Sequence, residues 1–292
     1  SEAIIAILDT GLNYNHEDFA GKVDLARSKN YVADPSSGSG AALDDYGHGT
    51  AVAGVIGAIG NNAKGIAGLD WKAKLLPIKV LRSDGKGDMS AVSSGLAYLT
   101  ALKTIGVNIV SVNMSLGQTN SGTNKYVEES VGDLKSNCQA AFNSGMVLVA
   151  AAGNDGLDYN TYPAYYSTVI AVAATDTADL RSIWTGGASS NYGPWVDVSA
   201  PGSSIYSTLR DSNSSYGNGW NGTSLACPLV AALASLMKAA DASLTNEAIV
   251  NQIKRSVDNI DALNPVYAGK LGSGRINAYR AVQVETPLPT AT

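Results

Sequence analysis

The sequence predicts an α/β protein with a three-layer, doubly wound fold, in which a mostly parallel central sheet is flanked by helices. Two observations support this fold class. Unbroken apolar runs, typical of strands buried on both faces of a parallel sheet, alternate along the chain with longer segments of helical pattern. Glycine supplies 31 of the 292 residues, above its average usage, which indicates many tight turns between these elements.

The expected strands are the apolar runs. The first covers residues 3–8 and ends at Asp9. The others cover residues 75–81, 107–112, 146–152 and 168–174. Asn154 follows the fourth run after a single glycine. In a doubly wound sheet the binding crevice lies beyond the carboxyl ends of the parallel strands, so Asp9 and Asn154 are expected at the same edge.

The expected helices lie between and after these strands. Three of them cover residues 48–59, 90–105 and 126–144. A fourth segment, residues 225–240, is apolar nearly all round, which predicts a helix buried in the centre of the domain. A fifth, residues 245–257, is amphipathic, and its first residue, Thr245, can start a helix.

Composition excludes several classes of protein. The net charge of −5 argues against binding to nucleic acid, which needs a basic surface. The longest apolar stretch, residues 225–237, is shorter than the ~20 residues of a membrane helix and contains Pro228. The apolar fraction of 45% suffices for a large core and argues against disorder. Cys138 and Cys227 are too few for a disulfide framework or a zinc site, and both are expected to be small buried hydrophobes.

Four short motifs carry residues suited to nucleophilic catalysis. They are Ala-Ile-Leu-Asp-Thr-Gly at 6–11, Tyr-Gly-His-Gly-Thr at 46–50, Ala-Ala-Gly-Asn at 151–154, and Asn-Gly-Thr-Ser-Leu-Ala-Cys-Pro at 221–228. A serine hydroxyl such as that of Ser224 needs a neighbouring base, and His48 can supply one. Asp9, at a rigid strand end, can fix the tautomer of His48, and Thr10 could hold the Asp9 carboxylate. Taken singly, each residue could equally be an ordinary turn or helix-start residue.

In this order, the four motifs resemble those of the subtilisin-like serine proteases, the subtilase family. The resemblance runs from Ile4 to about Val282, so we expect one catalytic domain over residues 1–283 and a Pro/Thr-rich tail over residues 284–292. It implies a serine endopeptidase that acts through an acyl-enzyme intermediate. By the same resemblance, Asp9, His48 and Ser224 form the triad, and the side chain of Asn154 forms the oxyanion hole with Thr223 and the amide of Ser224.

The resemblance also implies how a peptide is bound. The substrate would lie as an extended strand between two backbone edges, formed by Gly85, Lys86 and Gly87 on one side and by Ser115, Leu116 and Gly117 on the other. Ala151, Ala152 and Gly153 would line the pocket for the residue before the scissile bond. These small walls predict a preference for bulky apolar or aromatic side chains. Thr161 would form a shallow pocket floor, and Asp155 at the rim would tolerate polar or basic residues.

A structural calcium site is a further expectation from the resemblance. Side-chain oxygens of Asp18 and Asn62 and the carbonyl oxygens of Gly60, Lys64 and Ile66 would bind Ca²⁺, which prefers hard oxygen ligands. The carbonyl groups of Ala164, Tyr166 and Val169 could form a second, weaker site. An ordinary polar turn is the alternative at the first site, because Asn-rich turns are common.

The family pattern further implies a secreted monomer that is made with an inhibitory pro-segment, removed on maturation. The chain opens without a signal peptide, so we expect a mature form, and an intracellular enzyme is the alternative. Leu225 and Cys227 depart from the residues usual in the family, but both keep the helix apolar, so activity should survive. A catalytically silent peptide-binding protein is the main functional alternative, and an esterase or peptide ligase is a third.

Overall fold

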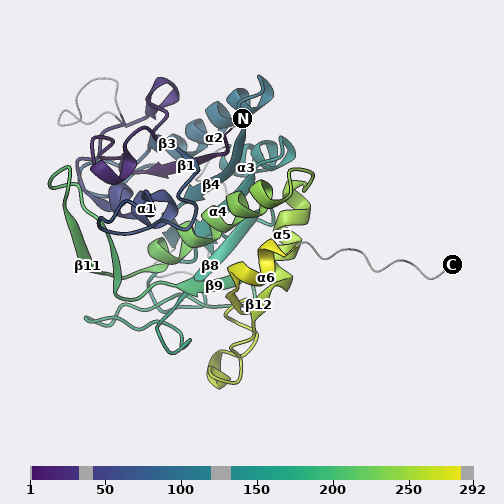
Figure 1. Cartoon of the computed structure of the whole chain (residues 1–292). Helices are drawn as coiled ribbons and strands as arrows, with labels where there is room; N and C mark the ends of the chain where they lie inside the picture. Colours follow the sequence, from purple (N-terminus) through teal and green to yellow (C-terminus); the bar gives the residue numbers. More distant parts are fainter. Residues whose placement is uncertain (1, 33–41, 120–132, 284–292) are drawn as a thin grey trace.

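The first apolar run forms strand β1 (Ile4–Asp9), which lies inside a nine-stranded sheet (Figure 1). The computed structural model describes residues 2–32, 42–119 and 133–283. In these residues the strand order is β12-β13-β9-β8-β6-β4-β1-β3-β2. The strands beside β1 are β2 (Lys29–Asn30), β3 (Lys74–Lys79), β4 (Ile109–Met114), β6 (Val147–Ala151), β8 (Val169–Thr175), β9 (Val198–Pro201), β12 (Val257–Asp258) and β13 (Arg275–Ile276). All neighbouring pairs are parallel except β12 and β13.

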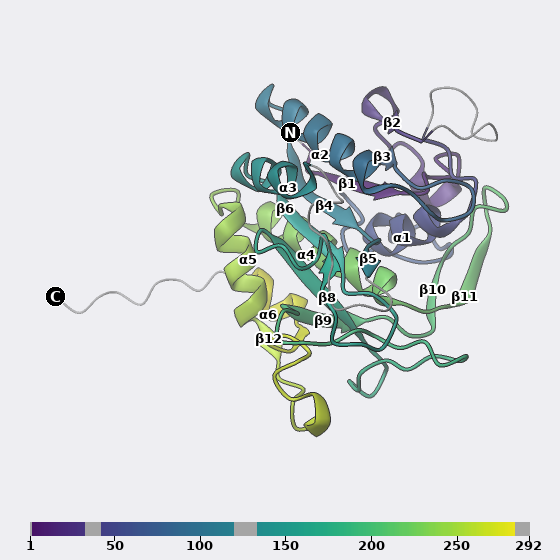
Figure 2. The same ribbon diagram turned by 180° about the vertical axis from the view of Figure 1, so that it is seen from behind.

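Helices cover both faces of this sheet. Side chains of α1 (His48–Gly57), α4 (Thr223–Ala240), α5 (Asn246–Arg255) and α6 (Ala278–Val282) pack against one face. Those of α2 (Met89–Thr104) and α3 (Leu134–Asn143) pack against the other face, which Figure 2 turns toward the viewer. The three-layer α/β fold predicted from the sequence is therefore confirmed.

The alternation of side chains along β1 explains why the run is apolar throughout. Ile5 and Ile7 point into the core beneath α1 and α4, whereas Ala6 and Leu8 point into the core beneath α2. Each of the isoleucine and leucine side chains, when fully buried, contributes roughly 1.5–3 kcal/mol. The sheet therefore holds Asp9, at the end of this strand, in a fixed position at its carboxyl edge.

Most expected elements lie within about two residues of the observed ones. The expected helix at 126–144 is observed as α3 from Leu134, and its first residues, like the tail at 284–292, lie outside the described residues. The sequence reasoning missed the short strands β2, β9, β12 and β13, the hairpin of β10 (Ile205–Thr208) and β11 (Tyr216–Trp220), and the pair of β5 (Gln118–Thr119) and β7 (Thr161–Tyr162). It also missed α6 and the short 3₁₀ helices η1 (Glu17–Phe19), η2 (Leu25–Arg27) and η4 (Pro265–Tyr267).

Helix α4 runs through the middle of the domain. By length and composition it could cross a membrane, but 67% of its 18-residue span is buried inside the structure, as in core helices of globular proteins. Cys227 on α4 and Cys138 on α3 are both free and buried, as expected. Burial raises the pKa of the Cys138 thiol to about 12 and also raises the pKa of Cys227. Neither thiol is therefore ionised at neutral pH.

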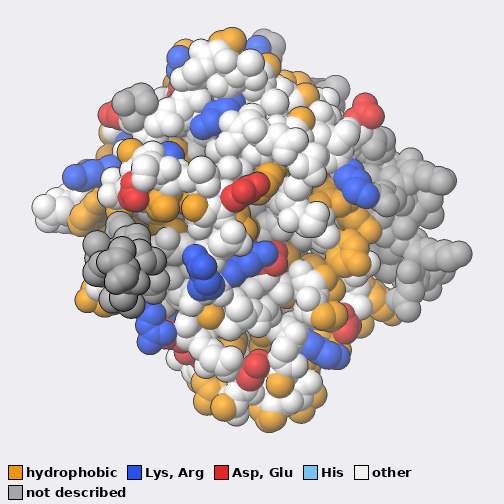
Figure 3. All heavy atoms as spheres, turned by 90° about the vertical axis from the view of Figure 1, so that its right-hand side faces the viewer, with side chains coloured by type: hydrophobic (Ala, Val, Ile, Leu, Met, Phe, Trp, Pro, Cys, Tyr) orange, Lys and Arg blue, Asp and Glu red, His pale blue; other side chains and the backbone are white. Residues whose placement is uncertain are grey.

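The surface drawn in Figure 3 carries charges of both signs. On this face Lys and Arg side chains alternate with Asp and Glu side chains, and apolar atoms lie between them. Interspersed charges create little net field of one sign. The described residues on this face therefore do not form the continuous basic surface that nucleic acid would need.

Candidate active site

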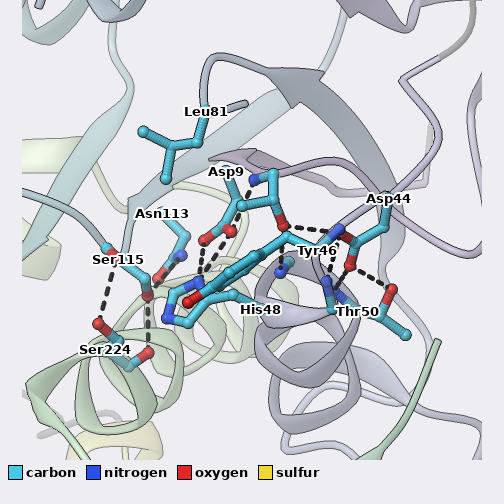
Figure 4. Close-up of polar contacts among 12 residues, drawn as sticks. Asp9, Asp44, Tyr46, His48, Thr50, Leu81, Asn113, Ser115 and Ser224 are labelled. Atoms are coloured by element: carbon cyan, nitrogen blue, oxygen red, sulfur yellow. Dashed lines mark hydrogen bonds and ion pairs between the residues drawn. The ribbon is translucent and has the colours of Figure 1, made fainter. Parts of the chain in front are cut away.

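Asp9 and His48 form a hydrogen-bonded pair at the carboxyl edge of the sheet (Figure 4). Nδ1 of His48 lies 2.8 Å from Oδ1 and 3.0 Å from Oδ2 of Asp9, and the Asp9 side chain is fully buried. The backbone N–H of Thr10 also donates to Oδ1 of Asp9, at 2.7 Å. With a proton on Nδ1 shared with the carboxylate, Nε2 of neutral His48 is left as an acceptor, which is what a general base requires.

The electrostatic surroundings of His48 favour its protonated form. Burial by itself lowers the pKa of His48, but the charge and hydrogen bond of Asp9, together with the charge of Asp44, outweigh burial and raise this pKa above 6.5. The imidazole therefore becomes a stronger base than it is in water. A raised pKa also makes it easier for His48 to hold a proton taken from a neighbouring hydroxyl.

Asp44 is a second buried carboxylate beside this pair, and the sequence reasoning missed it. Its oxygens accept bonds from the amides of Gly47 and Thr50 in the first turn of α1 and from the hydroxyls of Thr10 and Thr50, at 2.6–2.8 Å. The Thr10 hydroxyl thus points to Asp44, and the expected bond from Thr10 to the Asp9 carboxylate is made by the Thr10 backbone N–H instead. Asp44 therefore connects the end of β1 to the start of the helix that carries His48. Its position four residues before His48 was the sequence signal that could have identified it.

Lys79 is a buried cation on the other side of the same strand end. It stands opposite Asp9 in the β1–β3 register, and its side chain is fully buried. Its ammonium group donates to the carbonyl oxygens of Thr10 and Leu81 and to Oδ1 of Asp45, each at 2.7 Å. Three acceptors satisfy the three N–H donors of a lysine, so the charge is buried without an unpaired donor.

Ser224 lies in the first turn of α4 and is held by Ser115. The Ser224 hydroxyl donates to the carbonyl oxygen of Ser115 at 3.2 Å, and the Ser115 hydroxyl donates to the carbonyl oxygen of Ser224 at 2.7 Å (Figure 4). Asn113 Nδ2 in turn donates to the Ser115 hydroxyl. Pro228 explains the second bond: four residues after Ser224, it has no N–H to give to the Ser224 carbonyl, so the Ser115 hydroxyl takes the place of the missing helical bond.

Asn154 lies beside the start of α4. Its Oδ1 accepts from the amide of Thr223 at 2.9 Å and from the Thr223 hydroxyl at 3.0 Å, while this hydroxyl accepts from the amide of Gly153. With its oxygen held in this way, the Asn154 amide nitrogen is available as a donor next to the helix N-terminus, where backbone amides favour negative charge. Thr223 therefore positions Asn154, a different role from the expected one of donor to an oxyanion.

A groove of about 1160 Å³ brings His48 and Ser224 together with both expected substrate edges. Its lining includes Gly85, Lys86 and Gly87 on one side and Ser115, Leu116 and Gly117 on the other. Tyr46, half exposed, also lines it and packs over Gly85. Both expected edges and Ser224 therefore line one groove.

A smaller pocket of about 210 Å³ opens on the other side of Ser224. It is lined by Leu116, Gly117, Ala151, Gly153, Asn154, Asp155, Thr161, Thr223 and Ser224. Thr161 is buried, and its Cγ2 lies 2.5 Å from where a Cβ on Gly117 would stand, so its methyl group closes the pocket against that glycine. Ala152, expected in the wall, is not in the lining. It is fully buried in a core cluster behind it, so this expectation is corrected.

The residues of the expected calcium site also come together, in part. Asp18 is fully buried, its Oδ1 accepts from Asn62 Nδ2 at 2.6 Å, and its Oδ2 has no hydrogen-bond partner in the described residues. An unpaired buried carboxylate oxygen fits a cation. The side-chain oxygen of Asn62, however, accepts from the backbone amide of Lys64. The Asn62 side chain would therefore have to turn over for this oxygen to bind a metal.

The remaining ligands of that site would be backbone carbonyls. The described residues contain no group of three or more His, Cys, Asp or Glu side chains suited to a metal ion. Calcium, unlike zinc, accepts carbonyl oxygens, and the segment of Gly60, Lys64 and Ile66 follows Ile59, whose amide donates to the Asp18 carbonyl at 3.0 Å. At the expected second site, the Tyr166 carbonyl already accepts from the amide of Val169 at 2.9 Å, in the turn that follows Ala164.

Comparison with known proteins gives one family. The family model described as "Subtilase family" matches residues 1–274. Thermitase of Thermoactinomyces vulgaris is 40% identical over 283 residues, which cover 97% of this chain and 89% of thermitase. Subtilisin BL of Lederbergia lenta is 34% identical over 281 residues, 96% of this chain and 90% of that protein. A solved protease of Pseudoalteromonas arctica superposes with a TM-score of 0.80 at 27% identity, over 97% of this chain and 89% of the other. The chain therefore belongs to the subtilase family, which makes it a subtilisin-type serine peptidase.

Proposed function

We propose that the chain is a serine endopeptidase that uses Asp9, His48 and Ser224 as its triad. The Ser224 hydroxyl turns from the Ser115 carbonyl toward Nε2 of His48, gives its proton to that nitrogen and attacks the scissile carbonyl carbon. His48 then returns the proton to the leaving amine as the C–N bond breaks, which leaves an acyl-enzyme. A water molecule repeats both steps and frees Ser224. Asp9 holds the imidazole in the required tautomer throughout.

The developing oxyanion would be stabilised by two donors, the Asn154 amide nitrogen and the backbone N–H of Ser224. The Thr223 bonds to Oδ1 support this assignment, because they turn the nitrogen of the Asn154 amide away from Thr223. Such fixed donors act on charge that develops only in the transition state. The single observation that carries the proposal is that His48, hydrogen-bonded to the buried Asp9 carboxylate, lines the same groove as Ser224.

Hydrolysis of a chromogenic peptide tests the proposal. Ser224→Ala should lower turnover by about 10⁵–10⁶, because the nucleophile is lost. Ser235→Ala is the matched control: Ser235 is a buried serine on the same helix, and its hydroxyl has no hydrogen-bond partner in the described residues. A protein that binds peptides but hydrolyses none, and that no fluorophosphonate labels, would be the silent peptide-binding alternative. Ester cleavage lost in the same Ser224 variant would be a side activity of the triad.

The proposal extends to substrate choice. The smaller pocket would take the residue before the scissile bond and would favour bulky apolar or aromatic side chains, with Thr161 limiting its depth and Asp155 attracting basic ones. Gly85 to Gly87 and Ser115 to Gly117 would pair with the substrate backbone as two flanking strands. Their common groove with Ser224 supports this arrangement.

We also propose Ca²⁺ as a structural ion at Asp18, with Asn62 and the carbonyl groups of Gly60, Lys64 and Ile66, and a weaker site at Ala164, Tyr166 and Val169. The ion would neutralise the buried carboxylate and join it to the 60–66 segment. Family membership supports a single catalytic domain over residues 1–283, secretion, maturation by loss of an inhibitory pro-segment, and action as a monomer on proteins or peptides. Mass spectrometry and light scattering of the exported enzyme would test these points.

A further inference from the structure

Asn191, in the loop between β8 and β9, is a fully buried amide whose polar atoms are all engaged. Its Oδ1 accepts from the amides of Asp155 and Leu157, each at 3.0 Å. Its Nδ2 donates to the Ala152 carbonyl at 2.9 Å and reaches the Thr161 hydroxyl at 3.3 Å. Each of these four partners belongs either to the segment 152–157, which carries Asn154, or to the floor of the smaller pocket.

The backbone around Asn191 holds the same segment. The amide of Asn191 donates to the Gly153 carbonyl at 2.9 Å, and the amide of Ser189 donates to the Asn154 carbonyl at 3.1 Å. Asn154 is thus fixed on both sides by residues 189–191, although its own side chain is exposed. Gly153 has a φ of +102°, and a Cβ there would collide with Nδ2 of Asn191. The turn before Asn154 therefore depends on close approach to this one amide.

We propose that Asn191 is a positioning residue, which aims the amide of Asn154 at the oxyanion and fixes Thr161 at the pocket floor. This inference rests on the proposed function, because it assigns Asn191 no contact with substrate. One side chain would then couple transition-state stabilisation to the choice of the residue before the scissile bond. Nothing in the four motifs points to it, since Asn191 lies 37 residues after Asn154 in a polar loop.

Asn191→Asp separates the bonds that the side-chain oxygen of Asn191 accepts from the bonds that its side-chain nitrogen donates. A carboxylate of the same shape can still accept from the amides of Asp155 and Leu157, but it cannot donate to the Ala152 carbonyl and repels it. The segment before Asn154 loses its side-chain bond and keeps only the backbone bond from residue 191 to Gly153, while the segment after it stays bound. Removing an oxyanion donor outright costs about 10²–10³ in kcat, so a misaimed one should cost about 10–100-fold in kcat, with KM changed less. Substrates with the largest side chain in the pocket should lose most.

A double-mutant cycle with Asn154→Ala tests the inference. We expect Asn191→Asp to lower kcat when Asn154 is present and to change it by less than about twofold when Asn154 is already alanine, because Asn191 acts through it. Equal losses in both backgrounds would overturn the inference, as would a change in KM alone. If Asn154→Ala itself leaves kcat unchanged, the proposed oxyanion role of Asn154 fails instead, which is a different result.

Asn264→Asp is the matched control. Asn264 is also buried, its Oδ1 accepts from the amide of Arg181, and its Nδ2 donates to the carbonyls of Asp179 and Ile260, away from the groove. This variant should lower Tm without changing kcat per active site, as counted by titration with an irreversible serine reagent. If Asn191→Asp does not fold, Asn191→Ser, which removes the amide without adding a charge, goes through the same cycle with the same two outcomes.

Discussion

The hydroxyl of Ser115 donates to the carbonyl oxygen of Ser224 at 2.7 Å and thereby replaces a helical bond that Pro228 cannot make. Ser115→Ala should leave this buried carbonyl unpaired and lower the free energy of unfolding by about 1–3 kcal/mol. It should also lower kcat, because the first turn of α4 is loosened. In a Pro228→Ala background the backbone N–H of residue 228 is restored and Ser115→Ala should cost much less. Urea unfolding and kcat of the four proteins decide this, and equal costs in both backgrounds would refute it.

The pH dependence of activity should report the charge of Asp44. If His48 is the base, as proposed, activity requires its neutral form, so its raised pKa should move the acid limb of kcat/KM to higher pH than an ordinary histidine would give. Asp44→Asn removes a negative charge that favours protonated His48, so the limb should move to lower pH. The variant is also expected to be less stable, because its amide nitrogen would face the N–H group of either Gly47 or Thr50, which donate to different oxygens of Asp44. Rates per titrated active site separate the two effects, and an unmoved limb would contradict the electrostatic role.

Thr161 and Asp155 should control the residue accepted before the scissile bond. Thr161→Gly removes the methyl group that meets Gly117, so kcat/KM for tyrosine or tryptophan at that position should rise about tenfold relative to alanine. Asp155→Ala should lower kcat/KM for lysine and arginine only about two- to fivefold, since exposed charge pairs are weak. A peptide library measures both changes. An unchanged cleavage profile in the two variants would show that Thr161 and Asp155 do not control which residue the pocket accepts.

Chelation should destabilise the protein through Asp18. If the free calcium concentration is about 100 times the Kd, removing calcium should lower the free energy of unfolding by about 2.7 kcal/mol, or Tm by ~5–10 °C. Asp18→Asn should abolish this response to chelator. Asp70→Asn, at a buried carboxylate that accepts from the amides of Lys72 and Ala73, should keep it. Scanning calorimetry with and without chelator distinguishes the variants, and an unchanged wild-type Tm would end the calcium proposal.

Lys22 should make stability rise with pH above neutrality. Its ammonium group donates to the carbonyl oxygens of Gly57, at the end of α1, and of Trp71. Burial lowers its pKa from 10.5 to about 8, with smaller contributions from neighbouring charges. Below pH 8 the folded state carries the full cost of a buried charge, and this cost disappears as pH rises from about 8 to 10.5. The gain is at most about 3 kcal/mol.

Comparison with Lys22→Met isolates this contribution. Both proteins should carry Ser224→Ala, which prevents self-digestion during urea unfolding at pH 7.5 to 9.5. The difference in unfolding free energy between them should change steadily with pH across this range, because only the lysine titrates. A constant difference would show that the Lys22 pKa is not lowered. All other titratable groups are common to the two proteins, so their contributions largely cancel in this difference.

The sequence predicted the sheet, its helices and the positions of Asp9, His48, Asn154 and Ser224, because each of these follows a strand or begins a helix with strong local signals. It did not reveal Asp44, Asn191 or Lys79. Their roles come from contacts with residues far away in the chain, such as Lys79 with Asp45 and Asn191 with Ala152. It also misassigned Thr223, whose hydroxyl donates to Asn154, and it gave no sign that the Thr10 hydroxyl donates to Asp44. The local sequence pattern predicts where a residue lies in the fold, whereas its hydrogen-bond partner depends on tertiary packing.

His48 and Ser224, the proposed base and nucleophile, both lie in the first turns of helices of the same layer, for α1 and α4 pack directly against each other, whereas Asp9 belongs to the sheet. The distance from His48 to Ser224 therefore depends on the relative position of α1 and α4. The distance from His48 to Asp9 depends on how α1 packs against the sheet. On heating, a shift of α1 relative to α4 would separate His48 from Ser224 while the strands of the sheet remain paired. Loss of hydrolysis and loss of circular dichroism would then record two separate events, the first at the lower temperature.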